Sequence, residues 1–165
     1  MMHLSRHPFA GFLAVGLLCL TSRAFCQQAP SEADQILGLW LTADSKARIE
    51  VYKNSEQYAG KIVWLKEPTK NGRPAVDDKN PDEKLRNRPI LGMELMYGFV
   101  YDEDATWVDG QVYDPESGDE YSGKLRLVND STMALRGYVL IPLLGRTETW
   151  TRVKTGQSTE NTTTR

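Results

Sequence analysis

The sequence predicts an all-β domain in which eight antiparallel strands close into an up-and-down barrel with one long, partly helical connector. Short runs rich in β-branched and aromatic residues alternate along the chain with turn residues, which is typical of strands. Most connectors between these runs are short and contain Asp, Asn, Ser or Gly, so neighbouring strands are expected to pair antiparallel. Closing eight such strands removes the exposed edges and leaves room for side chains or one small ligand.

A polar leader, residues 27–35, precedes the barrel domain at 36–154, and a tail at 155–165 has no apolar residue and is expected to be disordered. The predicted strands are Ile36–Thr42, Ala47–Lys53, Tyr58–Leu65, Ile90–Tyr101, Thr106–Tyr113, Glu120–Val128, Thr132–Val139 and Arg146–Val153.

Residues 1–26 have the pattern of a secretory signal peptide: a basic start is followed by an apolar run, 9–20, that is too short to span a bilayer. Small residues precede two cleavage points, before Phe25 and before Gln27, and the second is preferred. A lipoprotein, acylated on Cys26, is the alternative. The sequence therefore predicts export to the periplasm or the cell surface, with no integral membrane span in the mature chain.

Cleavage before Gln27 would also remove both histidines and both cysteines. Removing Arg6 and Arg23 from the 20 basic residues leaves 18, against 22 acidic residues, for a net charge of −4. This balance argues against nucleic-acid binding. Without histidine or cysteine there is no Ser-His-Asp triad, thiol nucleophile or imidazole-ligated metal. We expect no cofactor, and an enzyme is the less favoured class.

The long connector, 66–89, carries helix signals. Asn80 is a good helix N-cap, Pro81 suits the first helical position, and Arg86 and Arg88 suit the carboxyl end of the helix dipole. One or two helical turns are therefore predicted before Pro89.

The acidic residues in this connector have two interpretations. Asp77, Asp78 and Asp82 could offer oxygen atoms to Ca²⁺, but the spacing lacks the alternating oxygens and the glycine of a calcium loop. Capping and ion pairing explain them without a metal, with Arg86 and Arg88 pairing with Asp78 to hold the connector over a barrel mouth. No metal site is predicted.

The acidic stretch "GQVYDPESGDEYSG", 110–123, is interpreted as a hairpin tip. Asp114 before Pro115 starts a turn, and Gly118 supplies the positive φ that the return needs. Its carboxylates are then expected to lie in water.

Two resemblances add to this interpretation. "GLW", 38–40, on the first strand and Arg152 on the last resemble the lipocalin and fatty-acid-binding (calycin) arrangement, which implies that Gly38 and Trp40 meet Arg152 across the closed end of the barrel. The chain also resembles the family known as domain of unknown function 2147, which consists of exported bacterial proteins. The resemblance covers nearly all of residues 36–153 and rests on "GLW", "DDKNPDEKLRNRPILG", "GQVYDPESGDEYSGKLRL", "LRGYV" and "LGRTETWTR". It implies a β-barrel-like domain without an established activity.

The last strand contains most of the candidate ligand-binding residues. Period two places Arg146, Glu148, Trp150 and Arg152 on one face and threonines on the other. If Arg152 points inward to Trp40, the whole charged row points inward and could bind an anionic headgroup. The alternative is that the threonines face inward, because buried charge is costly unless it is paired.

The first strand leaves the same question open. Leu37, Leu39 and Leu41 share one face, and Trp40 shares the other with Gly38. If the leucines fill the core, Trp40 faces outward. A lone carboxylate in an apolar strand, Glu94, is assigned to the solvent side.

The function predicted is an exported, non-enzymatic barrel that binds a small amphipathic or anionic molecule in its lumen or mouth through Trp40, Arg146, Glu148, Trp150 and Arg152. The alternative is a packed barrel without a lumen ligand that acts as a protein-interaction module of the cell envelope. The sequence identifies neither the ligand nor the oligomeric state.

Overall fold

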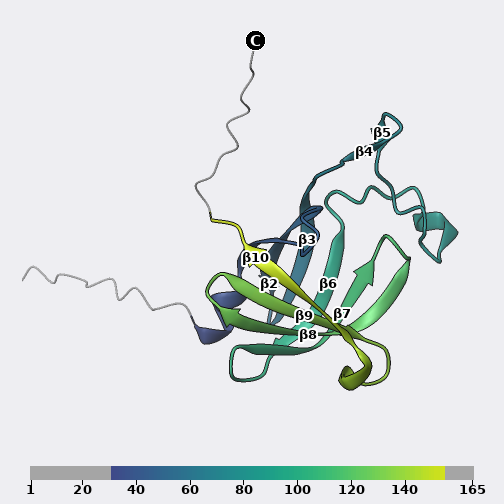
Figure 1. The fold of residues 1–165 in the computed structure, drawn as a ribbon. Helices are drawn as coiled ribbons and strands as arrows, with labels where there is room; N and C mark the ends of the chain where they lie inside the picture. Colours follow the sequence, from purple (N-terminus) through teal and green to yellow (C-terminus); the bar gives the residue numbers. More distant parts are fainter. Residues whose placement is uncertain (1–30, 155–165) are drawn as a thin grey trace, which may run out of the picture.

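The computed structural model describes residues 31–154, which form a closed eight-stranded antiparallel barrel (Figure 1). The predicted signal peptide, the start of the leader and the tail lie outside the described residues. The neighbours around the barrel are β1-β10-β9-β8-β7-β6-β3-β2, and β4 and β5 form a separate two-stranded sheet. This confirms the predicted fold class. The strands are β1 Gly38–Leu41, β2 Ala47–Asn54, β3 Gln57–Leu65, β4 Thr69–Lys70, β5 Arg73–Pro74, β6 Glu94–Tyr101, β7 Thr106–Asp114, β8 Asp119–Asn129, β9 Thr132–Tyr138 and β10 Arg146–Arg152.

Strand β1 closes the barrel by pairing with both β2 and β10. Trp40 lies opposite Arg152 in the β1–β10 register and is fully buried, whereas Leu39 and Leu41 beside it are only half-buried. The row with Trp40 therefore faces inward, which answers the question that the sequence left open. Along β10 the same side of the strand faces inward, because Trp150 is buried while Thr149 and Thr151 are exposed.

A short 3₁₀ helix, η1 (Glu32–Ile36), lies at one end of the barrel, which we call the closed end. Ile36, predicted to begin the first strand, instead ends this helix and is fully buried in the core. The indole N–H of Trp107 donates to the carbonyl of Ala33 at 3.2 Å, and the hydroxyl of Tyr58 donates to Asp34 at 2.6 Å. The hydrogen bond from Tyr58 lowers the pKa of Asp34. Part of the predicted leader is thus the plug of the closed end.

The long connector between β3 and β6 contains the β4–β5 hairpin and a single 3₁₀ turn, η2 (Glu83–Leu85). It extends from the side of the barrel opposite η1 (Figure 1). The strand after it begins at Glu94 rather than at Ile90, because Gly92 has a positive φ of +89° and the Met93 N–H donates to the Ile90 carbonyl in a turn. A third 3₁₀ turn, η3 (Pro142–Leu144), lies between β9 and β10.

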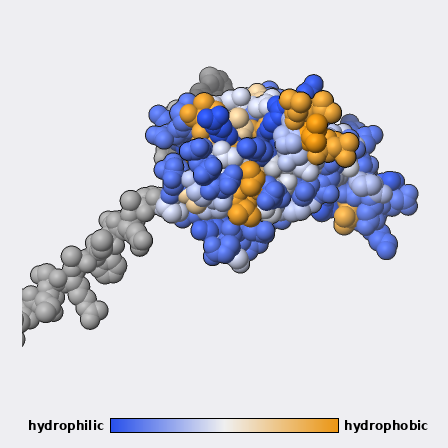
Figure 2. Space-filling model, turned by 90° about the horizontal axis from the view of Figure 1, so that it is seen from below, coloured by the Kyte–Doolittle hydropathy of each residue, from blue (hydrophilic) through white to orange (hydrophobic). Residues whose placement is uncertain are grey.

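Hydrophilic side chains cover most of the face shown in Figure 2, and the largest of its hydrophobic patches lies at one end. The loop between β9 and β10 supplies the most exposed large apolar side chains among the described residues: Leu140, Leu143 and Leu144 are 89%, 82% and 75% exposed. The core proper is built from inward-facing residues of all eight barrel strands together with Ile36 and Met93.

Candidate functional site

A cavity of about 920 Å³ opens at the end of the barrel opposite η1, which we call the mouth. Strands β2, β6, β8 and β10 begin there, and β1, β3, β7 and β9 end there. Small-molecule pockets in proteins typically have volumes of roughly 300 to 1,000 Å³. The mouth therefore contains an open space on the scale of a small ligand, bordered by strands and loops of the barrel.

The inner wall of the cavity is apolar. Six of its lining side chains are buried members of the core: Ile49, Ile62, Leu95, Val112, Leu135 and Trp150. They come from β2, β3, β6, β7, β9 and β10, so the apolar wall involves six of the eight barrel strands. A ligand that reached it would place apolar surface against these side chains and gain the free energy of leaving water, about 25 cal/mol per Å² of apolar area.

The rim of the cavity is charged. Five acidic and three basic side chains line it: Asp44, Glu67, Asp114, Glu116, Glu148, Lys46, Lys66 and Arg146. The acidic surplus disfavours a polyanionic ligand, because several negative charges could not all avoid a carboxylate. A single anionic group near one of the basic side chains remains compatible with this rim.

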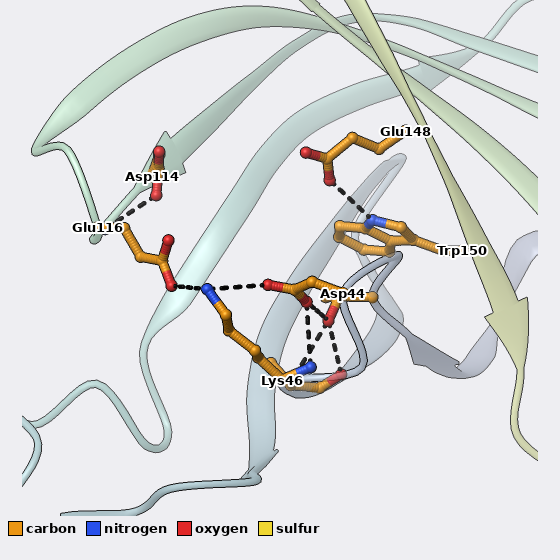
Figure 3. A network of polar contacts seen from close by, with 8 residues as sticks. Asp44, Lys46, Asp114, Glu116, Glu148 and Trp150 are labelled. Carbon is orange, nitrogen blue, oxygen red and sulfur yellow. Dashed lines mark hydrogen bonds and ion pairs between the residues drawn. The ribbon is translucent and has the colours of Figure 1, made fainter.

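Lys46 joins two loops of the rim (Figure 3). Its Nζ lies 2.7 Å from Oε1 of Glu116, in the β7–β8 turn, and 3.3 Å from Oδ2 of Asp44, in the β1–β2 loop. The hydrogen bond with Glu116, followed by that with Asp44, raises the pKa of Lys46. Burial raises the pKa of Asp44, but hydrogen bonds from Thr42 and Lys46 more than offset it, so the net shift is downward. Glu116, expected to lie free in water, is therefore exposed but paired.

Strand β10 brings three of the five predicted ligand-binding residues to the cavity. Trp150 belongs to the buried wall, whereas Glu148 and Arg146 are exposed and lie nearer the start of the strand, at the rim. The indole N–H of Trp150 donates to Oε2 of Glu148 at 3.5 Å (Figure 3). Among the described residues, Arg146 has no ion pair and no side-chain hydrogen bond, so its guanidinium is free to meet a ligand at the rim.

The other two predicted ligand-binding residues lie at the closed end, outside the cavity lining. The guanidinium of Arg152 sits 4.2 Å from the ring centroid of Trp40. Its nitrogens donate to the carbonyls of Leu37, Gln35 and Asp130 at 2.5 to 2.7 Å. Burial lowers the pKa of Arg152. These contacts use the donors of Arg152 to tie β10 to the plug, so we leave Trp40 and Arg152 out of the site.

Gly38 explains how Arg152 reaches the plug. Its φ is +127°, a conformation that side chains rarely adopt, and a Cβ there would lie 3.1 Å from Nη1 of Arg152. Glycine at this position therefore keeps the path of the guanidinium open.

The connector is held against the barrel by a buried carboxylate. Asp77 is fully buried and accepts hydrogen bonds from the Tyr113 hydroxyl at 2.6 Å, from Asn80 at 2.7 Å and from Arg88 at 2.7 Å. Burial raises the pKa of Asp77, but these three hydrogen bonds outweigh it and hold the pKa below its ordinary value. Burial, followed by the hydrogen bond to Asp77, raises the pKa of Tyr113 to about 12. Because Tyr113 also lines the cavity, this network positions part of the mouth.

Two predictions about this connector are wrong. The N-cap of η2 is Asp82, whose carboxylate accepts from the Lys84 N–H, while Asn80 is buried and accepts instead from the Asp82 N–H. The arginines do not pair with Asp78: Arg88 pairs with Asp77, Arg86 with Glu83, and Asp78 with Lys70. Asp78 is exposed, so the strong partner for a guanidinium is the buried neighbour.

The β7–β8 turn packs against the connector. Asp114 accepts hydrogen bonds from the Glu116 N–H at 2.9 Å and from the Ser117 hydroxyl at 3.0 Å, and Pro115 follows it in the turn. Gly118 has a φ of +82°, and a Cβ there would lie only 2.1 Å from the Lys79 carbonyl oxygen. The acidic stretch thus forms the predicted hairpin tip, and Gly118 is also required because the connector passes so close.

Sequence reasoning missed Asp77, Tyr113 and Lys46 as parts of the mouth. Asp77 and Asp78 are identical in type and adjacent, so nothing in their pattern says which is buried. Lys46 and Glu116 are 70 positions apart and meet only because the barrel brings their loops together. The alternation of β7 does predict that Tyr113 and Gln111 share a face, but not that a connector covers it.

Within residues 31–154 there is no group of three or more His, Cys, Asp or Glu side chains placed to hold a metal ion. Over the same residues, no helix has the length and apolar character needed to cross a membrane.

Three comparisons with known proteins place the chain. The family model described as "Uncharacterized protein conserved in bacteria (DUF2147)" matches residues 38–152. Among solved structures, protein HP1028 from Helicobacter pylori, described as belonging to the lipocalin family, superposes with a TM-score of 0.64 at 19% sequence identity. That match covers 72% of this chain and 83% of the other. No curated protein sequence matches the chain. The barrel is therefore lipocalin-like, and the likeness concerns the fold.

Proposed function

The chain belongs to the family of uncharacterized bacterial proteins DUF2147, and we propose that it binds a small amphipathic molecule in the mouth of its lipocalin-like barrel. One observation carries the proposal: a cavity of about 920 Å³ joins an apolar inner wall to a charged rim. Such a cavity suits a ligand with an apolar body and one polar head. No catalytic step is part of this proposal.

The head of the ligand is proposed to be a single carboxylate or similar anion bound by Arg146. The guanidinium of Arg146 lines the cavity and has no partner among the described residues, and its fork of donors suits a carboxylate. Glu148, two residues further along the same face, would repel a second negative charge. The rim therefore favours one anionic group over a polyanion, and Trp150 would contact the apolar body next to it.

The competing function, a packed barrel that acts only through its surface, fits the structure less well. A packed barrel would have its interior filled by side chains, whereas here the apolar wall borders open space. The exposed β9–β10 loop indicates a role for the surface as well, and that role is treated separately below.

A quenching experiment tests the proposed function. A brominated long-chain carboxylic acid, kept below its micellar concentration, is titrated into the protein while tryptophan fluorescence is recorded. We expect saturable quenching that is lost in Trp150→Phe and retained in Trp64→Phe, because Trp64 is 37% exposed, stacks on Arg48 and lies outside the cavity lining. Equal quenching in both variants, or quenching that never saturates, would refute binding in the cavity.

The head group is tested with a matched pair of probes. A brominated alkyl trimethylammonium of the same chain length should bind more weakly than the carboxylate. Arg146→Gln should remove that preference, and Lys66→Gln, at another point of the rim, should preserve it. An unchanged preference in Arg146→Gln would assign the head group to another side chain.

We propose export as well, on the pattern of residues 1–26 alone. Mass spectrometry of the protein recovered from a bacterial envelope or medium should find a chain that begins at Gln27, or at Phe25 for the alternative cleavage. A chain that retains residues 1–24 would contradict export through this segment.

A further inference from the structure

The loop between β9 and β10, residues 139–145, projects apolar side chains from the mouth end of the barrel into solvent. The exposed fractions are 60% for Val139, 89% for Leu140, 49% for Ile141, 82% for Leu143 and 75% for Leu144. Figure 2 shows the largest hydrophobic patch of this face at one end, with smaller patches elsewhere on a mostly hydrophilic surface. Single exposed leucines need no explanation, but five neighbouring apolar side chains in one loop indicate contact with an apolar environment.

The loop is held in this exposed arrangement by Arg136. Its Nε donates to the carbonyl of Pro142 at 2.6 Å, its Nη2 to the carbonyl of Leu143 at 3.1 Å, and its Nη1 to the hydroxyl of Thr147 at 2.7 Å. Leu140 has a φ of +70°, which is unfavourable for a bulky side chain. The most exposed leucine thus occupies a strained backbone position, and the guanidinium fixes the turn beside it. The leucines therefore project from an ordered turn.

The wall that carries the loop is basic on its outer face. Lys124 and Arg126 are exposed on β8, and Lys124 lies opposite Arg136 in the β8–β9 register. Within residues 31–154, none of these three basic side chains forms an ion pair. The outward row of β10 consists of Thr147, Thr149 and Thr151. The outward carboxylates of this wall lie at its two ends: Glu120 and Asp119, at the mouth end of β8, accept from Tyr97 and Tyr121, and Asp130 lies in the β8–β9 turn at the closed end.

We propose that the β9–β10 loop, held by Arg136, inserts into the surface of an anionic lipid bilayer, while Lys124 and Arg126 meet the lipid headgroups. Apolar insertion combined with basic side chains is the physical requirement for interfacial membrane binding. A protein partner fits less well, because stable protein interfaces bury roughly 800 Å² per partner, and this apolar surface is confined to one turn next to unpaired charge. Charge complementarity therefore favours the bilayer as the occupant.

Docking in this way would bring one side of the mouth, where Arg146 lies beside the β9–β10 loop, to the membrane. A second hollow, of about 400 Å³, is lined by Tyr121, Tyr138, Leu140, Leu144 and Arg146 among others, and it shares Tyr121, Gly137 and Arg146 with the lining of the main cavity. The loop that inserts is thus continuous with the cavity rim. An amphipathic ligand could pass between bilayer and barrel without crossing bulk water, although docking does not depend on any ligand being bound.

Vesicle binding tests the proposal in a chain that begins at Gln27. This chain keeps every residue of the closed barrel and omits the apolar run 9–20, which could itself bind lipid. It also lacks cysteine, so Leu143→Cys provides a single attachment point for an environment-sensitive fluorophore. With vesicles of phosphatidylglycerol and phosphatidylethanolamine, we expect the emission to rise and shift to the blue. The same label at Val128→Cys, which is 59% exposed near the closed end, should not respond.

Flotation of the unlabelled protein with the same vesicles supplies the affinities. Leu140→Ser combined with Leu143→Ser should weaken binding by about tenfold or more, and Lys124→Gln combined with Arg126→Gln should weaken it several-fold and reduce its salt dependence. Val128→Ser and vesicles of pure phosphatidylcholine are the controls, with unchanged binding expected for the first and weak binding for the second.

Absence of wild-type binding, or binding unaffected by the leucine variant, would overturn the proposal. A soluble dimer lost in the leucine variant would also overturn it and would assign the loop to a second copy of the chain. The Trp150 quenching measurement in lipid-free solution is independent, so failure of one proposal leaves the other standing.

Discussion

The two ends of the barrel are built from similar residue types but treat them in opposite ways. At the closed end, Trp40 is fully buried beneath Arg152, and the guanidinium donates hydrogen bonds to three backbone carbonyls. At the mouth, Trp150 is also buried, but Arg146 has no partner within residues 31–154. Trp40 and Arg152 seal the barrel together, whereas Trp150 and Arg146 border an open cavity without contacting each other.

The difference lies in what each end covers with backbone. At the closed end, η1 brings carbonyls and Ile36 over the core, so polar and apolar groups are both satisfied internally. At the mouth, loops surround an opening, and the charged rim and the leucines of the β9–β10 loop remain exposed. Polar and apolar groups are thus satisfied internally at one end of the barrel and left exposed at the other, where we propose that binding occurs.

The largest expected effect comes from removing the seal. Trp40→Ala should lower the free energy of unfolding by about 3 to 5 kcal/mol, because a fully buried indole leaves a large cavity. Trp150→Ala should cost less, since one side of that indole already borders open space. Urea unfolding of both variants measures the difference. Equal losses would show that the two tryptophans are equally embedded and would weaken the contrast between the ends.

Asp77 tests whether the mouth is also held from outside the barrel. Asp77→Asn should cost about 2 to 3 kcal/mol at neutral pH, because the buried network loses its negative charge and one of the two acceptor oxygens of Asp77. The folded-state pKa of Asp77 lies below the ordinary 3.8, so its carboxylate contributes stability above pH 3.8 that is lost as the pH falls toward the folded-state pKa. The variant should therefore show a flatter loss of stability below pH 3.8. Asp78→Asn, at an exposed carboxylate, is the control and should behave like the wild type.

Variants at Leu140 test whether backbone strain at the mouth lowers the free energy of unfolding. Leu140→Gly should raise the free energy of unfolding by about 0.5 to 1 kcal/mol, because relief of the positive φ outweighs the entropy cost of glycine. Leu143→Gly lies in the same loop without a positive φ and should lower it by a similar amount. Thermal unfolding of the pair checks the sign. If both variants are destabilised, Leu140 is not strained in the folded protein.

The smallest effect on stability is expected at the rim. Lys46→Met should leave the urea midpoint unchanged within error, because the pairs with Glu116 and Asp44 are solvent-exposed. The same change frees the β1–β2 loop from the β7–β8 turn, so the carboxylate probe should enter and leave the cavity faster in stopped-flow quenching. Lys66→Met, at a rim lysine without an ion pair among the described residues, should leave both rates unchanged. Slower entry in Lys46→Met would mean that the lysine attracts the probe and does not restrict the opening.

Much of the architecture could be read from local pattern. The eight barrel strands, their antiparallel order and the turn at Gly118 follow from alternation and turn residues, which act over a few positions. The contact of Trp40 with Arg152 was implied by family resemblance and is present at 4.2 Å. The sequence predicted only a polar leader for the residues at the start of η1. A 3₁₀ turn is too short for its sequence to show a helical repeat of hydrophobic residues.

By itself, the sequence determined that this chain forms a closed β-barrel and that Arg146, Glu148, Trp150 and Arg152 share one face of the last strand. Only the tertiary structure decided that this face is divided, with Arg152 sealing one end and Arg146 open at the other. It also decided that Asp77, and not Asp78, is the buried partner of Arg88. The physical reason is that alternation assigns a side chain to a face, whereas burial and pairing depend on which distant loops cover that face after the barrel closes.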